Sequence, residues 1–489
     1  MKRFWLVLLS LGLVMAFSVS AFAVDVKVSG EYYAAGLYLN KTTVKDVPSE
    51  STAFFFQRLR IGTDFVVSPC LKLVTRFDAM ERIWGGARGE SAASTLLGSD
   101  EQSAGTRSES QNIAFDLAYI DYTSPVGLFR VGYQPDYEWG TVFGNRTSGP
   151  TAGQITYILP IGPVILVGQY AKETDNSASA VTTGVTTTDQ DKDSYRLGAI
   201  YKFGTDKAKG EVGGLMLFNR YAENKANTYT SSGPTPPAGT YDVGYLTNVY
   251  KAIPYFKTQI GPVAFQGEFE YTFGNAVKAE SSALGNPLIL GKYAQPNMDI
   301  SAWSVFLDAT ATFGPVYFGG SFVYLTGDDP GTKDKIEGGA GVNTAGLDWN
   351  PCLIMFNTID TQYWAGSFGG YNGSWAVDNE MSNIYFFQGK VGVKPIPQLD
   401  FMASVSYAAV DRKLAEPGGV NSITANNTGN YGWEIDATGT YKITNNLSYM
   451  LGIGYLFTGD YYKGFNNTPR VDNNVKDDYM LINKLTLSF

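Results

Sequence analysis

The clearest alternation of apolar and polar residues lies between positions 55 and 82. Apolar side chains share one parity on both sides of a short turn, at Phe55, Leu59, Ile61, Phe65, Val67, Leu73, Phe77 and Ala79. Charged side chains share the other parity, at Arg58, Arg60, Asp64, Lys72, Arg76, Asp78 and Arg82. A period of two gives a β-strand two unlike faces. The pattern therefore predicts two amphipathic strands joined by a turn at Ser68-Pro69-Cys70.

The same unit recurs along the chain, as a strand, a tight turn, a second strand and a long polar connection. We predict eight short turns, at 68–70, 124–127, 160–163, 204–210, 260–262, 313–315, 395–397 and 444–446. Long connections alternate with them, at 40–52, 85–110, 134–153, 173–192, 222–241, 275–298, 327–379, 411–429 and 459–476. Short turns at one end and long loops at the other are typical of transmembrane β-barrels.

Two terminal segments complete the pattern. Residues 24–39 form the candidate first strand, and residues 477–489 form an amphipathic last strand that ends on Phe489. The eight turns join sixteen strands, and the terminal strands raise the total to eighteen. Sixteen is the alternative, because residues 154–159 are few and could belong to a loop. We predict an all-β fold, an antiparallel up-and-down transmembrane barrel with short periplasmic turns and long external loops, which the last strand closes by pairing with the first.

The charged parity must face the inside of such a barrel. A charge on the lipid face costs about 2–4 kcal/mol at mid-depth. At sixteen or eighteen strands the interior is too wide for side chains to fill, so an aqueous channel is expected. Clusters of Tyr and Phe near strand ends, such as Tyr271 and Phe273, suit the aromatic girdles of a membrane barrel.

The N-terminus has the features of an export signal. Lys2 and Arg3 precede an apolar run from Phe4 to Phe17, and Ala21-Phe22-Ala23 fits a cleavage site. We expect a signal peptide at 1–23 and a single barrel domain at 24–489. No stretch of the remainder has the roughly 18 uninterrupted apolar residues of a membrane helix.

Composition removes several function classes. The 489 residues carry a formal net charge of −9, which makes a nucleic-acid partner a poor fit. The chain has no histidine, so it lacks the commonest general base and the usual nitrogen ligand of metals. Its two cysteines, Cys70 and Cys352, show no zinc or haem spacing and are expected on opposite rims, too far apart for a disulfide. We expect no enzyme activity, no cofactor and no metal.

In these features the mature chain resembles the general porins of Gram-negative outer membranes. The resemblance implies a homotrimer in outer-membrane lipid that passes small hydrophilic solutes and ions. It also implies that the closing aromatic residue, Phe489, belongs to the signal read by the barrel insertion machinery.

General porins also fold their third external loop inward, with acidic residues facing a basic wall. The third long connection here is 134–153, and its acids are Asp136 and Glu138. The resemblance makes these two acids constriction candidates, together with five arginines of the preceding strands: Arg58, Arg60, Arg76, Arg82 and Arg130. The alternative interpretation is that these are the scattered charges of any wide lumen.

Further along, the polar parity becomes acidic, at Glu268, Glu270, Glu434 and Asp436. A basic wall opposite an acidic wall would create a transverse field that orients solutes and sets ion preference.

Two loop starts look alike, Thr326-Gly327-Asp328-Asp329 and Thr458-Gly459-Asp460. Their acids could hold Ca²⁺ or bridge to lipopolysaccharide through divalent ions. The favoured interpretation is turn chemistry, in which Gly takes a positive φ and Asp accepts from the backbone. The long connection 327–379 contains an apolar stretch, 352–356, and Trp349, Trp364 and Trp375, so we expect it to pack into the barrel mouth or onto a neighbouring subunit.

Two classes of function follow. The first is a passive channel for small hydrophilic solutes. The second is a substrate-specific channel, or a sleeve for another outer-membrane component. A sleeve would keep its lumen wide and lack an inward loop.

Overall fold

The structure, a computed structural model, describes most of the chain from residue 24 to its end. The described ranges are 24–46, 48–84, 114–136, 139–143, 151–176, 189–205, 207–233, 237–280, 297–329, 331–339, 342–345, 349–369, 376–412, 429–462 and 474–489. The expected signal peptide, Glu138 and Trp375 lie outside them.

Within these ranges eighteen antiparallel strands form one closed barrel. The first nine are β1 (Asp25–Leu39), β2 (Thr52–Ser68), β3 (Leu71–Ile83), β4 (Ala114–Ser124), β5 (Gly127–Pro135), β6 (Thr151–Ile161), β7 (Val164–Thr174), β8 (Lys192–Gly204) and β9 (Ala208–Tyr221). The others are β12 (Tyr245–Ile260), β13 (Val263–Ala279), β14 (Asn297–Phe313), β15 (Val316–Leu325), β17 (Ile384–Ile396), β18 (Leu399–Val410), β19 (Asn430–Lys442), β20 (Leu447–Thr458) and β21 (Asp478–Ser488). This confirms eighteen strands over sixteen, since β6 and β7 pair on both sides of the Pro160–Pro163 turn.

Shorter elements lie in the long connections. A hairpin of β10 (Thr228–Ser231) and β11 (Gly239–Asp242) stands apart from the barrel sheet, and β16 (Lys335–Ile336) pairs in parallel with β14. The connection between β15 and β17 also holds a π-helical turn, η5 (Thr358–Gln362), and α3 (Tyr363–Ala365); a 3₁₀ turn, η7 (Asp460–Tyr462), follows β20. Among the described residues, no helix is long and apolar enough to cross a membrane.

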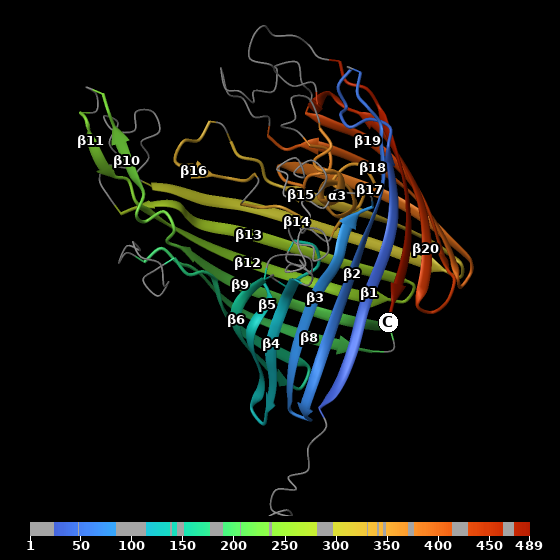
Figure 1. The fold of residues 1–489 in the computed structure, drawn as a ribbon, viewed down its shortest axis with the longest axis horizontal. Coiled ribbons are helices and arrows are strands. Elements are labelled where there is room, and N and C mark those ends of the chain that lie inside the picture. Colours follow the sequence, from blue (N-terminus) through green and yellow to red (C-terminus); the bar gives the residue numbers. More distant parts are fainter. Residues whose placement is uncertain are drawn as a thin grey trace, which may run out of the picture.

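The barrel closes where β1 pairs with β21, as the sequence predicts. The register runs from Glu31 opposite Ser488 to Leu39 opposite Met480. Beyond the last ladder pair, Gly30 and Phe489 exchange two backbone hydrogen bonds, of 2.8 and 3.0 Å. Figure 1 shows the first strand, in blue, beside the last strands, in red.

The two faces of the strands differ as the alternation predicts. On β19, Trp433 and Ile435 are about half exposed on the outer face, whereas Glu434 and Asp436 between them are buried. Aromatic rings line up across neighbouring strands on the outside. Tyr195, Phe218, Tyr250 and Phe273 stack in turn from β8 to β13. Such a row is what an aromatic girdle requires.

The buried apolar core lies inside the barrel, on one side of it. It joins lumen-facing residues of β1, β14, β15 and β17–β21, together with Phe56 near the start of β2, to the connection between β15 and β17. We call residues 349–369 of that connection the long inward segment. Ile354, Met355 and Trp364 of this segment are at most 3% exposed, and α3 lies within the outline of the barrel (Figure 1). The expectation that 327–379 packs into the barrel is confirmed for these residues.

Candidate pore lining

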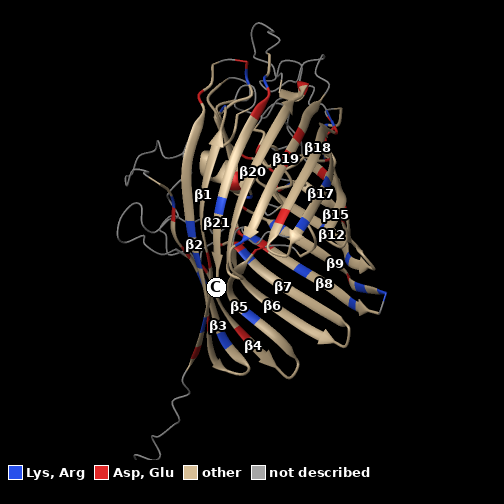
Figure 2. Cartoon of the chain, turned by 90° about the vertical axis from the view of Figure 1, so that its right-hand side faces the viewer, with Lys and Arg blue, Asp and Glu red and all other residues tan. Residues whose placement is uncertain are grey.

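Ion pairs cover the lumen side of β2 to β5. Arg60 makes two hydrogen bonds of 2.7 Å to the Asp78 carboxylate, and Arg76 binds Asp116 through bonds of 2.6 and 2.9 Å. Arg130 pairs with Asp121 at 2.9 Å. The expected basic wall is therefore a wall of alternating sign, because each of these arginines has a carboxylate on a neighbouring strand. Figure 2 shows blue and red bands on neighbouring strands of this region.

Arg58 sits deeper in the same face. Its guanidinium lies 3.9 Å from both Glu31 and Glu81, and its Cζ lies 5.1 Å from the centre of the Tyr33 ring. From the opposite side, the Tyr363 hydroxyl donates to Glu81. This group therefore links β1, β2 and β3 to the long inward segment.

Arg82 does not share this face, which corrects the predicted alternation. A β-bulge follows Ala79: the register skips one residue of β2 and two of β3, and Met80 has φ +52°. Beyond the bulge, Arg82 lies opposite Gln57, which alternates with Arg58. Glu81 takes the lumen position instead. The sequence pattern missed Glu81 because period-two counting cannot detect an inserted residue.

Asp136 pairs with a residue of β8 rather than with the arginines of β2 and β3. Its carboxylate lies 2.7 Å from the Arg196 guanidinium, which is buried and also donates to Gln169. The arginines at 58, 60, 76 and 130 pair with wall carboxylates instead.

Residues 139–143, the short inward segment, cross the lumen to β13. The Glu268 carboxylate accepts hydrogen bonds from the backbone N–H groups of Thr141, Val142 and Phe143, at 2.6, 2.7 and 3.3 Å, and from the Thr141 hydroxyl at 2.6 Å. Glu268 is 3% exposed. Part of the third long connection thus folds inward. Its attachment point, Glu268, is one of the acids that the sequence predicts on the acidic wall.

Glu270, two residues along, has a different partner. It pairs with Lys251 of β12 at 2.9 Å and accepts from the Thr272 hydroxyl at 3.0 Å.

Glu434 fixes the long inward segment as Glu268 fixes the short one. Its two oxygens accept from the backbone N–H groups of Ile354 and Met355, each at 2.6 Å. Asp436 accepts from Ser404 at 3.5 Å and from the backbone of Leu353. The acids predicted for the far wall are therefore covered by protein and do not face water. On the opposite side of the segment, Trp364 stacks on Phe56 of β2 at 4.8 Å between ring centres.

The lumen consequently has two unlike sides. The side formed by β1, β14, β15 and β17–β21 is packed with the long inward segment. Along β2 to β5, the paired side chains keep contact with water: Arg60 is 20% exposed, Asp116 25% and Lys72 36%.

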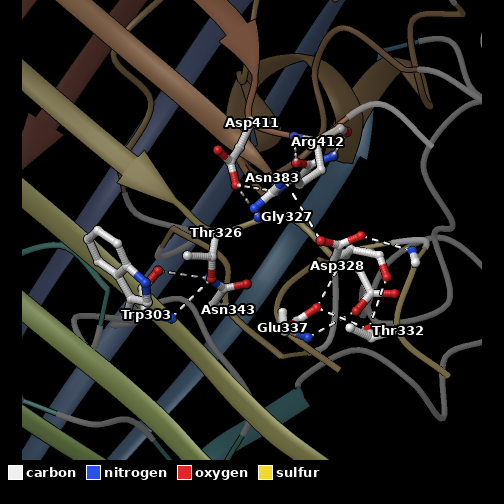
Figure 3. Close-up of polar contacts among 12 residues, drawn as sticks. Trp303, Thr326, Gly327, Asp328, Thr332, Glu337, Asn343, Asn383, Asp411 and Arg412 are labelled. Atoms are coloured by element: carbon white, nitrogen blue, oxygen red, sulfur yellow. Dashed lines mark hydrogen bonds and ion pairs between the residues drawn. The ribbon is translucent and has the colours of Figure 1, made fainter. Parts of the chain in front are cut away.

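The outer rim is held by polar contacts among loop residues (Figure 3). Asn343 is buried and donates to the Thr326 hydroxyl at 3.1 Å and to the Trp303 carbonyl at 3.2 Å. The Gly327 N–H donates to Asp411 at 2.9 Å. These contacts hold the middle of the long connection against β14 and its start against the end of β18.

The two similar loop starts follow turn chemistry in part. Asp328 accepts from the Glu337 N–H at 2.9 Å, as that interpretation predicts. The expected positive φ at Gly327 and Gly459 is wrong, since neither residue adopts one. Glycine is needed there for close approach. A Cβ would lie 1.9 Å from Asn383 Oδ1 at position 327 and 2.1 Å from the Asn430 carbonyl at position 459.

The cysteines are free, and Cys70 is exposed near a short turn. Cys352 is buried inside the barrel, not exposed at the outer rim, because its loop folds inward.

No protein-family model and no curated protein sequence matches the chain. Solved structures of outer-membrane proteins resemble it in fold. OpdK of Pseudomonas aeruginosa is 12% identical, with 95% of this chain and 99% of that one covered and a TM-score of 0.45. OccK2 (OpdF) of the same organism, solved with glucuronate, is 10% identical, with coverages of 95% and 98% and a TM-score of 0.48. A BenF-like porin of Pseudomonas fluorescens is 13% identical, with coverages of 96% and 100% and a TM-score of 0.47.

The strands themselves establish the architecture. A closed barrel of eighteen antiparallel strands, with tight turns at one end and long connections at the other, carries apolar residues outside and ion pairs inside. This is the architecture of a Gram-negative outer-membrane porin.

Proposed function

We propose that this chain is a non-enzymatic porin, a water-filled channel for passive diffusion of small hydrophilic solutes and ions. In this proposal residues 1–23 direct export and residues 24–489 form one barrel domain. The supporting observation is the strip of partly exposed ion pairs along β2 to β5, beside a side of the lumen that protein fills. Fixed charges beside water favour hydrated solutes over apolar ones.

The proposed constriction lies where the inward segments approach this strip. Arg58 and Glu81 are in contact there with Tyr33 and Tyr363, while Arg60, Arg76 and Arg130 continue the lining. Asp136 belongs to it through Arg196, and Glu138 is proposed as its neighbour on the loop.

The proposed setting is the outer membrane, with lipid around the outer face and lipopolysaccharide at the external loops. The homotrimer and the delivery by insertion machinery remain proposals from the resemblance to general porins.

A substrate-specific channel is the second candidate. Two inward segments reduce the lumen, and a narrow passage lined by paired charges can select solutes by shape and charge. The same segments speak against a sleeve around another component, which would need a wide lumen.

The test is conductance of the purified protein in planar bilayers, with swelling of liposomes in neutral sugars, amino acids and organic acids. A general channel gives ohmic steps and swelling rates that fall smoothly with solute size. A specific channel gives fast swelling for one chemical class only. A folded protein that gives neither conductance nor swelling would contradict both channel proposals.

Charge substitutions in the strip test its place in the conducting path. Arg60→Gln leaves Asp78 unpaired and is expected to shift the reversal potential in a salt gradient toward cation preference. Asp78→Asn removes the nearer of the two carboxylates beside Arg60, leaving Asp116 at 3.9 Å, and shifts the reversal potential toward anion preference. Both shifts should shrink at about 1 M salt, where the Debye length is roughly 3 Å.

The matched control is the double variant Arg60→Gln/Asp78→Asn, in which the net charge of the strip is unchanged and selectivity should stay near wild type. Single variants that both keep wild-type selectivity would mean that ions do not pass this strip.

A further inference from the structure

Three metal-binding side chains meet behind the long inward segment. The Cys352 sulfur and one carboxylate oxygen each from Glu434 and Asp436 all lie within 4.8 Å of one another. The three residues are 2%, 0% and 2% exposed. The two acids alternate along the lumen face of β19, and the thiol comes from the loop packed against them. In the described part of the chain, no other group of three such ligands lies as close together.

This group lacks the compensation that other lumen acids have. Asp78, Asp116 and Asp121 each have an arginine partner. No lysine or arginine of the described residues forms an ion pair with Glu434 or Asp436. Burying several acidic groups together without a cation is strongly unfavourable when they are ionised.

Hydrogen bonding does not fully satisfy the group either. Each Glu434 oxygen accepts from one backbone N–H of the segment, which leaves further lone pairs. The Oδ1 atom of Asp436 is buried and accepts from no N–H or hydroxyl group. The two carboxyls can share a hydrogen bond with each other only while one of them keeps a proton. Glu268 also lacks a basic partner and also has one buried oxygen without a donor, but its other oxygen accepts four hydrogen bonds and no thiol lies beside it in a three-ligand group.

Gly454 of β20 lies close to two of the oxygens. A Cβ built at position 454 would lie 2.8 Å from Asp436 Oδ1, 3.0 Å from Leu353 Cβ and 3.3 Å from Glu434 Oε1. The two oxygens therefore approach the β20 backbone at a position that only glycine fits.

We propose that Cys352, Glu434 and Asp436 bind one divalent cation of borderline softness, with Zn²⁺ as the best fit. A thiolate combined with carboxylates suits zinc, which takes sulfur at about 2.3 Å and oxygen at about 2.0–2.2 Å. Tetrahedral ligands at those distances stand about 3.3–3.8 Å apart, so no pair in the group has to approach by more than about 1.5 Å. On binding, the thiol and the carboxyl pair give up their protons to the solvent, and a water molecule completes the coordination. The cation would pin the long inward segment to the barrel wall.

Metal content of the folded protein in detergent tests this site. The protein is refolded with ZnCl₂, and also incubated with it after folding, so that slow entry does not hide binding; unbound metal is removed by gel filtration. We expect about one zinc per chain by mass spectrometry. Cys352→Ser and Asp436→Asn should each lower it at least about tenfold, since each removes one of only three protein ligands. The matched controls, Cys70→Ser and Glu268→Gln, should keep it. Heat-modifiable mobility in gels verifies folding of each variant.

Cobalt supplies a readout specific to the thiolate. Protein loaded with Co²⁺ should show a sulfur-to-cobalt charge-transfer band that Cys70→Ser keeps and Cys352→Ser loses. If Cys352→Ser fails to fold, the site is tested by the charge-transfer band of the wild-type protein and by the zinc content of Asp436→Asn. The proposed site would be overturned if the folded wild-type protein bound no zinc or showed no charge-transfer band. It would also be overturned if Asp436→Asn bound as much zinc as the wild-type protein. Conductance is measured separately, so this failure is distinct from failure of the channel proposal.

Discussion

Carboxylates inside the barrel differ in what satisfies them, and this difference decides what each one does. Asp78 has a guanidinium beside it and lines the water-accessible strip. One oxygen of Glu268 accepts from backbone N–H groups and holds a loop. Asp378, in the connection before β17, is wholly buried, accepts one bond of 2.9 Å from the Phe368 N–H, and has one oxygen without a donor. The poorly satisfied acid is the one that should respond to pH.

Burial raises the pKa of Asp378 from its ordinary value of 3.8 to about 7. When the segment opens, the exposed carboxyl returns to its ordinary pKa. Between about pH 4 and about pH 7 the closed form thus binds more protons than the open form, so closure weakens as pH rises through this window. Below about pH 4 the closed form keeps all of this added stability, and above about pH 7 it has lost all of it.

Hydrogen exchange of the Phe368 amide measures this closure. After correction for intrinsic exchange, protection should be higher at about pH 5 than at about pH 8. Asp378→Asn, which keeps an acceptor for the amide but cannot ionise, should show equal protection at both. A wild-type protein with pH-independent protection would mean that Asp378 is not the titrating group.

The alternation on β2 predicts opposite environments for two adjacent residues. A cysteine at position 60 should react with a small water-soluble thiol reagent through the lumen, and a cysteine at position 59 should not, because it faces lipid. Both variants are made in a Cys70→Ser background, since Cys70 is exposed. Labelling of the protein in membranes gives the rates; equal rates would show that the register is wrong.

At the scale of elements, β13 and β19 each present a lumen carboxylate to the backbone of a loop that folds inward. The two segments approach the strip from different connections, and apolar residues of both, Val142, Phe143 and Trp364 among them, belong to one core. Strands therefore position the loops, and the loops in turn shape the lumen.

Glu268→Gln should loosen the short inward segment. The four donors all bind one carboxylate oxygen, so the amide can keep an acceptor at that position but loses the negative charge. Hydrogen bonds to a charged group are worth about 1.5–3 kcal/mol each, so we expect at least about 2 kcal/mol less protection of the amides of Thr141 and Val142. Single-channel conductance should change in the same variant, with more open-state noise.

The matched control is Glu270→Gln, on the same face of the same strand but paired with Lys251. Its effect on exchange at 141–143 should be small. If the two variants loosen the segment equally, the attachment through Glu268 is not what holds it.

At the scale of the whole molecule, closure of the barrel depends on the seam between β1 and β21. Phe489 exchanges backbone hydrogen bonds with Gly30, and its ring covers that glycine: a Cβ at position 30 would lie 2.7 Å from Phe489 Cζ. Phe489→Glu places a charge beside lipid at this seam, at a cost that depends on depth and reaches about 2–4 kcal/mol at the midplane.

We therefore expect Phe489→Glu to assemble poorly in the outer membrane while its export remains normal. The fraction of heat-modifiable, folded protein in outer-membrane preparations measures assembly, with Phe489→Tyr as the matched control that keeps an aromatic ring. Wild-type amounts of folded Phe489→Glu protein would rule out a role for this residue in closure.

Local patterns in the sequence were sufficient to predict the barrel. Alternation with a period of two assigns faces, and Pro- and Gly-containing turns separate strands, because both depend on residues close together in the chain. The eighteen strands and the pairing of the ends followed from them. The prediction that Arg82 faces the lumen was wrong, because one extra residue in β3 exchanges the lumen-facing and outward-facing positions after it.

Tertiary structure decided what fills the lumen. The partners of Glu268 and Glu434 lie 126 and 80 residues away in the cases of Val142 and Ile354, so no local pattern could reveal them. An acid on the lumen parity can face water, an arginine or a loop backbone. The choice depends on which segments the closed barrel brings together, and burial of apolar loop residues drives that arrangement. The alternation of apolar and polar residues therefore determined the strands of the barrel wall, while long-range packing determined which loop segments fill the lumen.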